Sequence, residues 1–140
     1  MIKWVRIAYL IVAWLFVAGV LVQIFLAGLS LFQSAVYWPT HREFGYTIGW
    51  LFLPLLALAV LGRLPRAGGR WLLLVSVVYV VQTLLPMLRG GAPLIAALHP
   101  VIASVVLWSA LVHARRALAS LREARQGTVA ERPVAASTRS

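Results

Sequence analysis

Long apolar stretches without charge alternate with short polar or basic segments along this chain. The stretches that carry no Asp, Glu, Lys or Arg are Ile7–Thr40, Phe44–Gly62, Trp71–Leu88 and Gly90–Ala114. An α-helix needs about 20 apolar residues to cross a bilayer core, and each stretch is close to that length or above it. The pattern therefore predicts an all-α, antiparallel four-helix transmembrane bundle. Its spans are expected at about residues 5–34, 42–62, 71–88 and 93–114.

Composition and charge placement support this interpretation. The 140-residue chain is 62% hydrophobic and 11% charged, with a mean hydropathy of +0.92. Eleven of its 13 Lys and Arg residues lie before the first span, between the second and third, or after the fourth, and only Arg42 and Arg89 occupy the other two connections. The positive-inside rule then places both termini in the cytoplasm. Because topology explains the net charge of +10, we do not expect nucleic-acid binding.

Beyond the last span the chain becomes polar and basic, so residues 118–140 are predicted to form a cytoplasmic tail outside the membrane domain, 1–117. Residues 114–126 have the composition of a helical continuation that Gly127 would close. From Thr128 to Ser140 the residues are small, polar and unpatterned, which predicts disorder.

Two spans carry small residues and a histidine on one helical face. His41, Gly45 and Gly49 follow one another at intervals of four in span two, and each step drifts by only about 40°. Gly45 and Gly49 form a GxxxG pair, which allows close approach of another helix or of a flat ligand. His99, Ala103, Ala110 and His113 share one stripe of span four. Polar residues also line one face of span one, around Gln23, and of span three, around Tyr79 and Gln82, where interhelical hydrogen bonding is the favoured interpretation.

His41 and His99 are predicted to lie at similar depth, at the outer ends of spans two and four. Two helices that present histidine at one depth can hold a haem between them, so both are candidate axial ligands of one haem b. Gly45 and Gly49 would leave room for the porphyrin, and Arg42 and Arg89 could bind its propionates. Two alternatives remain open. Each histidine could instead cap a helix or bond a backbone carbonyl at the membrane boundary, or the pair could bind another metal.

Other site chemistries are poorly represented. His113 has no second histidine at its depth, so we expect no second haem and interpret it as an interfacial residue beside Arg115 and Arg116. The chain has no cysteine and no aspartate, and its three glutamates are scattered. Thiolate metal sites, paired-carboxylate acids and Ser–His–Asp hydrolysis are therefore not expected.

Trp50 and Trp108 each follow a candidate histidine by nine residues, which places them near mid-membrane on the opposite helix face. Such rings could contact lipid, a neighbouring helix or a partner chain in a homo-oligomer or larger membrane complex. This observation supports the alternative function, a non-catalytic membrane subunit or assembly factor without a cofactor. A small-solute transporter is less well supported, because the spans lack intramembrane charges and paired broken helices.

The sequence around the histidines also resembles known proteins. With His41-Arg42, Gly45 and Gly49, and then Leu98-His99-Pro100-Val101, the chain is similar from about residue 5 to 117 to a bacterial family of four-helix membrane proteins of unknown function. That resemblance implies a four-span fold in the bacterial cytoplasmic membrane. The His-Arg opening of span two is more distantly similar to motifs of haem A synthase and membrane b-type cytochromes. It maps only His41 and His99, as axial ligands.

Overall fold

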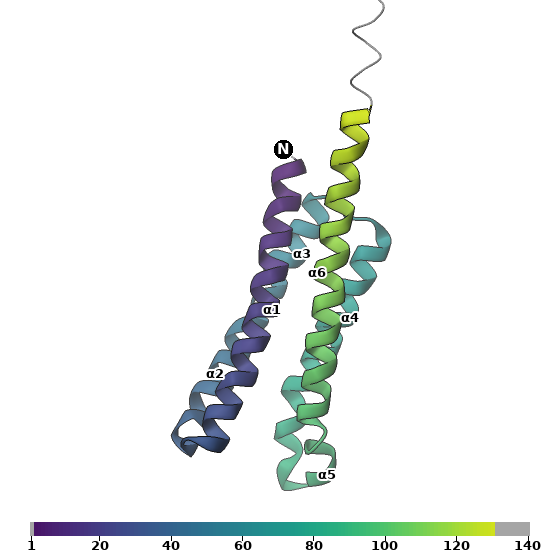
Figure 1. Ribbon diagram of the computed structural model, residues 1–140. Coiled ribbons are helices and arrows are strands. Elements are labelled where there is room, and N and C mark those ends of the chain that lie inside the picture. Colours follow the sequence, from purple (N-terminus) through teal and green to yellow (C-terminus); the bar gives the residue numbers. More distant parts are fainter. Residues whose placement is uncertain (1, 131–140) are drawn as a thin grey trace, which may run out of the picture.

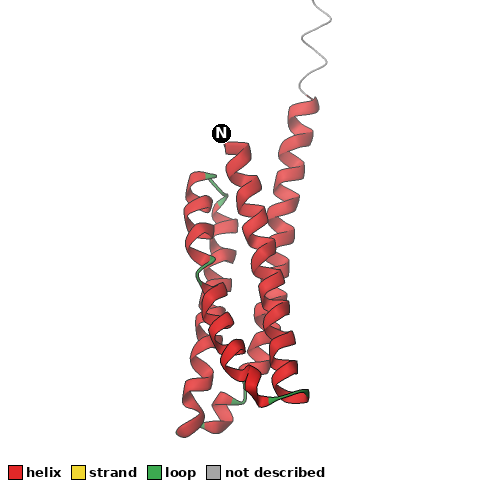
Figure 2. Cartoon of the chain, turned by 90° about the vertical axis from the view of Figure 1, so that its left-hand side faces the viewer, coloured by secondary structure: helices red, strands yellow, loops and turns green. Residues whose placement is uncertain are grey.

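The computed structural model describes the backbone of residues 2–130 and the side chains of residues 2–123. It is helical throughout this range, and short loops join the helices (Figure 2). In chain order the elements are α1 (Ile2–Phe32), η1 (Ala35–Tyr37), α2 (Trp38–Gly49), α3 (Phe52–Leu61), α4 (Arg66–Leu84), η2 (Leu85–Gly90), α5 (Pro93–Ala96) and α6 (His99–Ala130), where η marks a 3-10 helix.

These elements form four rods that are long and apolar enough to cross a membrane, which confirms the predicted fold class. The rods comprise residues Ile2–Phe32, Ala35–Leu61, Arg66–Gly90 and Pro93–Glu123. They run up and down, so the N-terminus and the last turns of α6 lie at the same end of the bundle (Figure 1). We call this end, with Lys3, Arg6, Arg63, Arg66, Arg70, Arg115, Arg116 and Arg122, the basic end. The opposite end, with His41 and His99, is the histidine end.

Prolines explain the breaks within the rods. Pro54 has no N–H to donate to the Trp50 carbonyl, and the chain passes from α2 to α3 at residues 50–51 through tighter bonds such as Leu53 N–H to Trp50 O. Pro100 lies in the first turn of α6, where its missing N–H costs no helical bond. The structure thus has His99 as the first residue of α6 and α5 as a separate turn before it.

The core is apolar and centred on aromatic rings. Phe16 of α1 contacts Phe52 of α3 and Tyr79 of α4, with ring centroids 4.8 and 5.4 Å away. Outside this core, large apolar side chains remain exposed around all four rods, among them Val60 at 77%. An apolar belt of this extent is typical of a surface that contacts lipid. Trp50 and Trp108 belong to it, 68% and 61% exposed, and a partner chain at these two positions stays a prediction.

The C-terminal expectations are partly wrong. Helix α6 continues through Gly127 to Ala130, so glycine does not close it and residues 128–130 are helical. Nothing in α6 requires a left-handed residue there, and an isolated glycine costs a helix interior only about 1 kcal/mol. The remaining part of the predicted disordered segment, residues 131–140, lies outside the described residues.

Candidate functional site

His41 is held by Gln23 across the α1–α2 interface. Its Nδ1 atom lies 3.1 Å from the backbone carbonyl oxygen of Gln23. The Gln23 side chain returns the contact: its Nε2 donates to the His41 carbonyl at 2.6 Å and lies 3.4 Å from the His41 Nε2 atom. Three polar contacts therefore fix the ring of His41 and the amide of Gln23 relative to each other.

His99 repeats this arrangement with Gln82 across the α4–α6 interface. Its Nδ1 lies 3.0 Å from the Gln82 carbonyl oxygen, and the Gln82 Nε2 lies 3.2 Å from the His99 Nε2. The bond to the carbonyl has a clear local cause. Pro86, four residues after Gln82, has no N–H to complete the helical ladder, so the imidazole supplies the donor that the backbone lacks.

These contacts define the tautomer of both histidines. A carbonyl oxygen only accepts hydrogen bonds, so Nδ1 must carry the proton in each ring. The Nε2 atom of a neutral imidazole then keeps its lone pair, and in both pairs a glutamine amide donates toward it. An Nδ1–H bonded to a carbonyl, with Nε2 as the free donor of electrons, is the state in which histidine commonly binds a metal.

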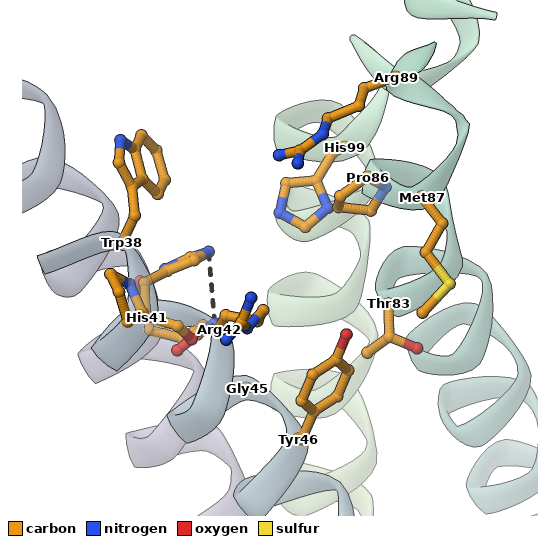
Figure 3. Close-up of a pocket in the computed structure, with 12 residues that line it drawn as sticks. Trp38, His41, Arg42, Gly45, Tyr46, Thr83, Pro86, Met87, Arg89 and His99 are labelled. Carbon is orange, nitrogen blue, oxygen red and sulfur yellow. Dashed lines mark hydrogen bonds between the residues drawn. The ribbon is translucent and has the colours of Figure 1, made fainter. Parts of the chain in front are cut away.

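The two rings lie side by side at the histidine end. Their centroids are 6.2 Å apart and their planes are inclined at 78°. Trp38 packs edge-on against His41, with a centroid separation of 5.5 Å. Figure 3 shows Trp38 and His41 on one side of the intervening space, Thr83, Pro86, Met87 and His99 on the other, and the Tyr46 ring between them, directed toward Thr83. The sequence-based expectation that His41 and His99 lie at similar depth thus corresponds to a direct juxtaposition.

A cavity of about 680 Å³ lies at this juxtaposition, within the usual range for small-molecule and cofactor sites. Its walls are formed by Gln23, Trp38, Pro39, His41, Arg42, Gly45, Tyr46, Thr83, Pro86, Met87, Arg89 and His99. Both predicted arginines are exposed at its rim, and Arg42 is paired with the carboxylate of its neighbour Glu43 at 2.9 Å. The cavity therefore combines apolar walls, two imidazoles and two cations.

The predicted glycines have different surroundings. Gly45 lines the cavity, and a Cβ atom there would lie 2.6 Å from Gln23 Nε2, so only glycine leaves room for the amide that contacts His41. The Gly45 carbonyl also accepts a hydrogen bond from the Tyr79 hydroxyl. Gly49 lies away from the cavity, where a Cβ would be 3.1 Å from the Tyr79 ring. The GxxxG pair thus packs against side chains of α1 and α4.

His113 is not the interfacial residue that the sequence suggested. Its side chain is buried, 5% exposed, and its Nε2 is hydrogen-bonded to the hydroxyl of Tyr9, which is also buried. The basic residues that follow it, Arg115 and Arg116, are exposed, so the change from core to surface occurs within one turn. His113 is on the same face of α6 as Ala110, and this face packs into the bundle. Tyr9 is the hydrogen-bond partner that a buried polar side chain needs.

The sequence did not reveal that Gln23 and Gln82 are the hydrogen-bond partners of the two histidines. One signal could have revealed them, because each glutamine precedes its histidine by nearly the same interval, 18 and 17 residues, across one helical hairpin. Among the residues that the structure describes, no group of three or more His, Cys, Asp or Glu side chains could hold a metal ion.

The fold and the site together define a multi-pass, four-helix membrane protein with a histidine-lined cavity at one end. Residues 23–88 match the model of a family of unknown function, DUF6220. The match begins at Gln23 and includes His41, Gly45 and Gln82, but it ends before Arg89 and His99. No curated protein and no solved structure matches the chain, so the distant resemblance to haem A synthase is not among these findings.

Proposed function

We propose that this membrane protein binds one b-type haem between His41 and His99, for electron transfer or haem handling. The observation that carries the proposal is the pair of imidazoles, 6.2 Å apart and inclined at 78°. Imidazole nitrogen binds transition metals at about 2.0–2.1 Å, so two rings that share one metal can have centroids about 6 Å apart. The observed separation supports His41 and His99 as the residues that would hold the haem.

The protonation pattern supports the same role. Both Nδ1–H groups are held by backbone carbonyls, which orients each ring and leaves Nε2 as the basic atom. Ligation would exchange the glutamine amide at each Nε2 for iron and leave both carbonyl bonds in place. The donor set also favours haem over a bare metal ion. A porphyrin supplies four nitrogen ligands itself, whereas structural and catalytic zinc sites need three or four protein ligands, and the described side chains form no such group.

The rim can accept the acidic groups of a haem. Arg42 and Arg89 are exposed beside the cavity and are the cations nearest to it, and a guanidinium binds a carboxylate in bidentate fashion. Arg42 would exchange its exposed partner Glu43 for a propionate, at small cost because surface ion pairs contribute only about 0–1 kcal/mol. When bound, haem would supply one-electron chemistry, and the two histidines would orient it.

The charge distribution supports an orientation for the proposal. The basic end would face the cytoplasm, by the positive-inside rule, and the histidine cavity would open at the outer face. We place the protein in the bacterial cytoplasmic membrane on the basis of this topology and of the resemblance described above. Haem would then be accessible to a redox partner or haem acceptor outside the cytoplasm.

Absorption spectra of the protein purified from haem-replete cells test the proposal. A Soret band with the reduced α and β bands of a six-coordinate haem is expected. His41→Ala and His99→Ala should each abolish the six-coordinate spectrum, and the double variant should lose the Soret band. His113→Gln is the matched control, because it removes the third histidine, which lies outside the cavity. A missing Soret band, or one unaffected by the double substitution, would refute haem binding.

A further inference from the structure

A second cavity lies at the basic end, between the start of α4 and the last part of the fourth rod. Its volume is about 160 Å³, and its walls include Trp71, His113, Arg116 and Ser120. The Arg116 guanidinium carbon lies 4.3 Å from the centroid of the Trp71 ring, a cation–π contact that positions the charge at the mouth of the cavity. The haem proposal uses none of these residues.

The charge around this cavity is strongly positive. Helix α4 begins at Arg66, so its N-terminal dipole adds to the charges of Arg66 and Arg116. Among the described side chains, the only carboxylate at this end is Glu123, about 10 Å along α6 from Arg116. Arg116, the arginine that lines the cavity, forms no ion pair among the described residues, where the one salt bridge is at the histidine end. The charge at the cavity therefore favours an anionic ligand.

An apolar track leads from the same cavity along the lipid-facing surface. The Trp71 ring contacts both Arg116 and Trp108, and the two tryptophan ring centroids are 6.4 Å apart. Trp108 precedes Arg116 by eight residues of α6, so it lies about 12 Å closer to the membrane centre than Arg116. Its side chain is 61% exposed. A ligand at this position would meet cations at its head and tryptophan rings along its tail.

The depth agrees with a lipid headgroup. Arg116 follows His99 by 17 residues of continuous helix, about 26 Å, and the hydrocarbon core of a bilayer is about 30 Å thick. With His99 near one boundary of the core, Arg116 lies close to the other. From these observations we infer that the cavity at Trp71 and Arg116 binds one anionic phospholipid, its phosphate at Arg116 and an acyl chain along Trp108.

Native mass spectrometry of the delipidated full-length protein in mild detergent tests this inference. The probes are dioleoylphosphatidylglycerol, dioleoylphosphatidylcholine and inorganic phosphate. We expect one phosphatidylglycerol to bind more tightly than phosphatidylcholine, and Arg116→Gln to weaken it about tenfold, the effect of one charge-assisted hydrogen bond. Arg115→Gln is the matched control. It removes the same charge from the adjacent exposed position outside the cavity, and should change binding less than about twofold.

Three results would overturn the inference. Equal losses in both variants would show that only the general positive field attracts the lipid. Equal affinity for the two lipids would remove the role of the anionic headgroup, and binding of inorganic phosphate as tightly as phosphatidylglycerol would remove the role of the acyl chain. Because both substitutions are at exposed positions, the circular dichroism spectra should stay unchanged. The loss of the contact with Trp71 should lower the unfolding midpoint of Arg116→Gln only slightly. The result is also independent of haem, whose spectrum neither variant should alter.

Discussion

Gly45→Ala should uncouple Gln23 from His41 and destabilise the bundle. The new methyl group would lie 2.6 Å from Gln23 Nε2, and the three nearest atoms to it all belong to that side chain. The amide must therefore move away, and its bonds to the carbonyl and ring of His41 break. The substitution thus affects the hydrogen bonds of one side chain, Gln23, and their loss can be measured as a change in stability.

The expected magnitude follows from two contributions. An interhelical hydrogen bond in a membrane contributes about 0.6–1.7 kcal/mol, and two such bonds break when the amide moves. Alanine in place of glycine within a helix returns about 0.5–1 kcal/mol. The net loss in the free energy of unfolding should be about 1–2 kcal/mol for Gly45→Ala. Gly28→Ala is the matched control, since a Cβ at Gly28 meets nothing within 4 Å, and it should be neutral or stabilising.

Equilibrium unfolding in mixed micelles, followed by circular dichroism, measures both values. The decisive comparison is a double-mutant cycle with Gln23→Ala, which removes the amide that the new methyl group would meet. In that background Gly45→Ala should be as harmless as Gly28→Ala. If Gly45→Ala costs nothing in the wild-type chain, or costs as much without the amide as with it, the contact with Gln23 is not what requires glycine.

Two further substitutions probe the other buried polar contacts. Tyr9→Phe leaves the buried His113 Nε2 without its partner and should lower the free energy of unfolding by about 1–3 kcal/mol in the same assay; no loss would contradict the contact. Pro86→Ala gives the helix an N–H four residues after Gln82, which competes with the His99 imidazole for the Gln82 carbonyl. The nitrogen-15 shifts of His99 should then change in NMR spectra, and unchanged shifts would refute the role assigned to the proline.

The length of the apolar runs was sufficient to predict four spans, because burial in lipid demands about 20 apolar residues and the chain offers four such runs. It also placed His41 and His99 at one end, since depth follows from residue counts along a helix. The bends within the spans were harder to predict from the sequence. The passage from α2 to α3 at Trp50 depends on Pro54, whose effect on an apolar run is a local tilt that composition does not register.

The orientation of side chains around the bundle was harder to predict than their depth. His113 was interpreted as interfacial because arginines follow it, yet its helix face turns it toward Tyr9. Which residue lies opposite depends on how α1 packs against α6, and a stripe on one helix does not specify its partner. For the same reason the small-residue face of Gly49 could be recognised, but not that Tyr79 occupies it.

The two Gln–His pairs have similar contacts to their histidines, but the two glutamine side chains differ in their other hydrogen bonds. This difference predicts which glutamine stabilises the fold and which mainly competes with iron for the histidine Nε2 atom. Gln23 also donates to the His41 carbonyl, whereas Gln82 makes no such bond to the His99 backbone among the described contacts. Both side chains leave a buried Oε1 atom without a partner, and Gln82 is 8% exposed. Leucine at position 82 would remove a buried unpaired oxygen along with one bond, so Gln82→Leu should change stability by less than about 1 kcal/mol. It would also free His99 Nε2 from the amide that competes with iron. Haem titrations should therefore show affinity equal to or above the wild type for Gln82→Leu, and weaker binding would mean that the amide assists ligation.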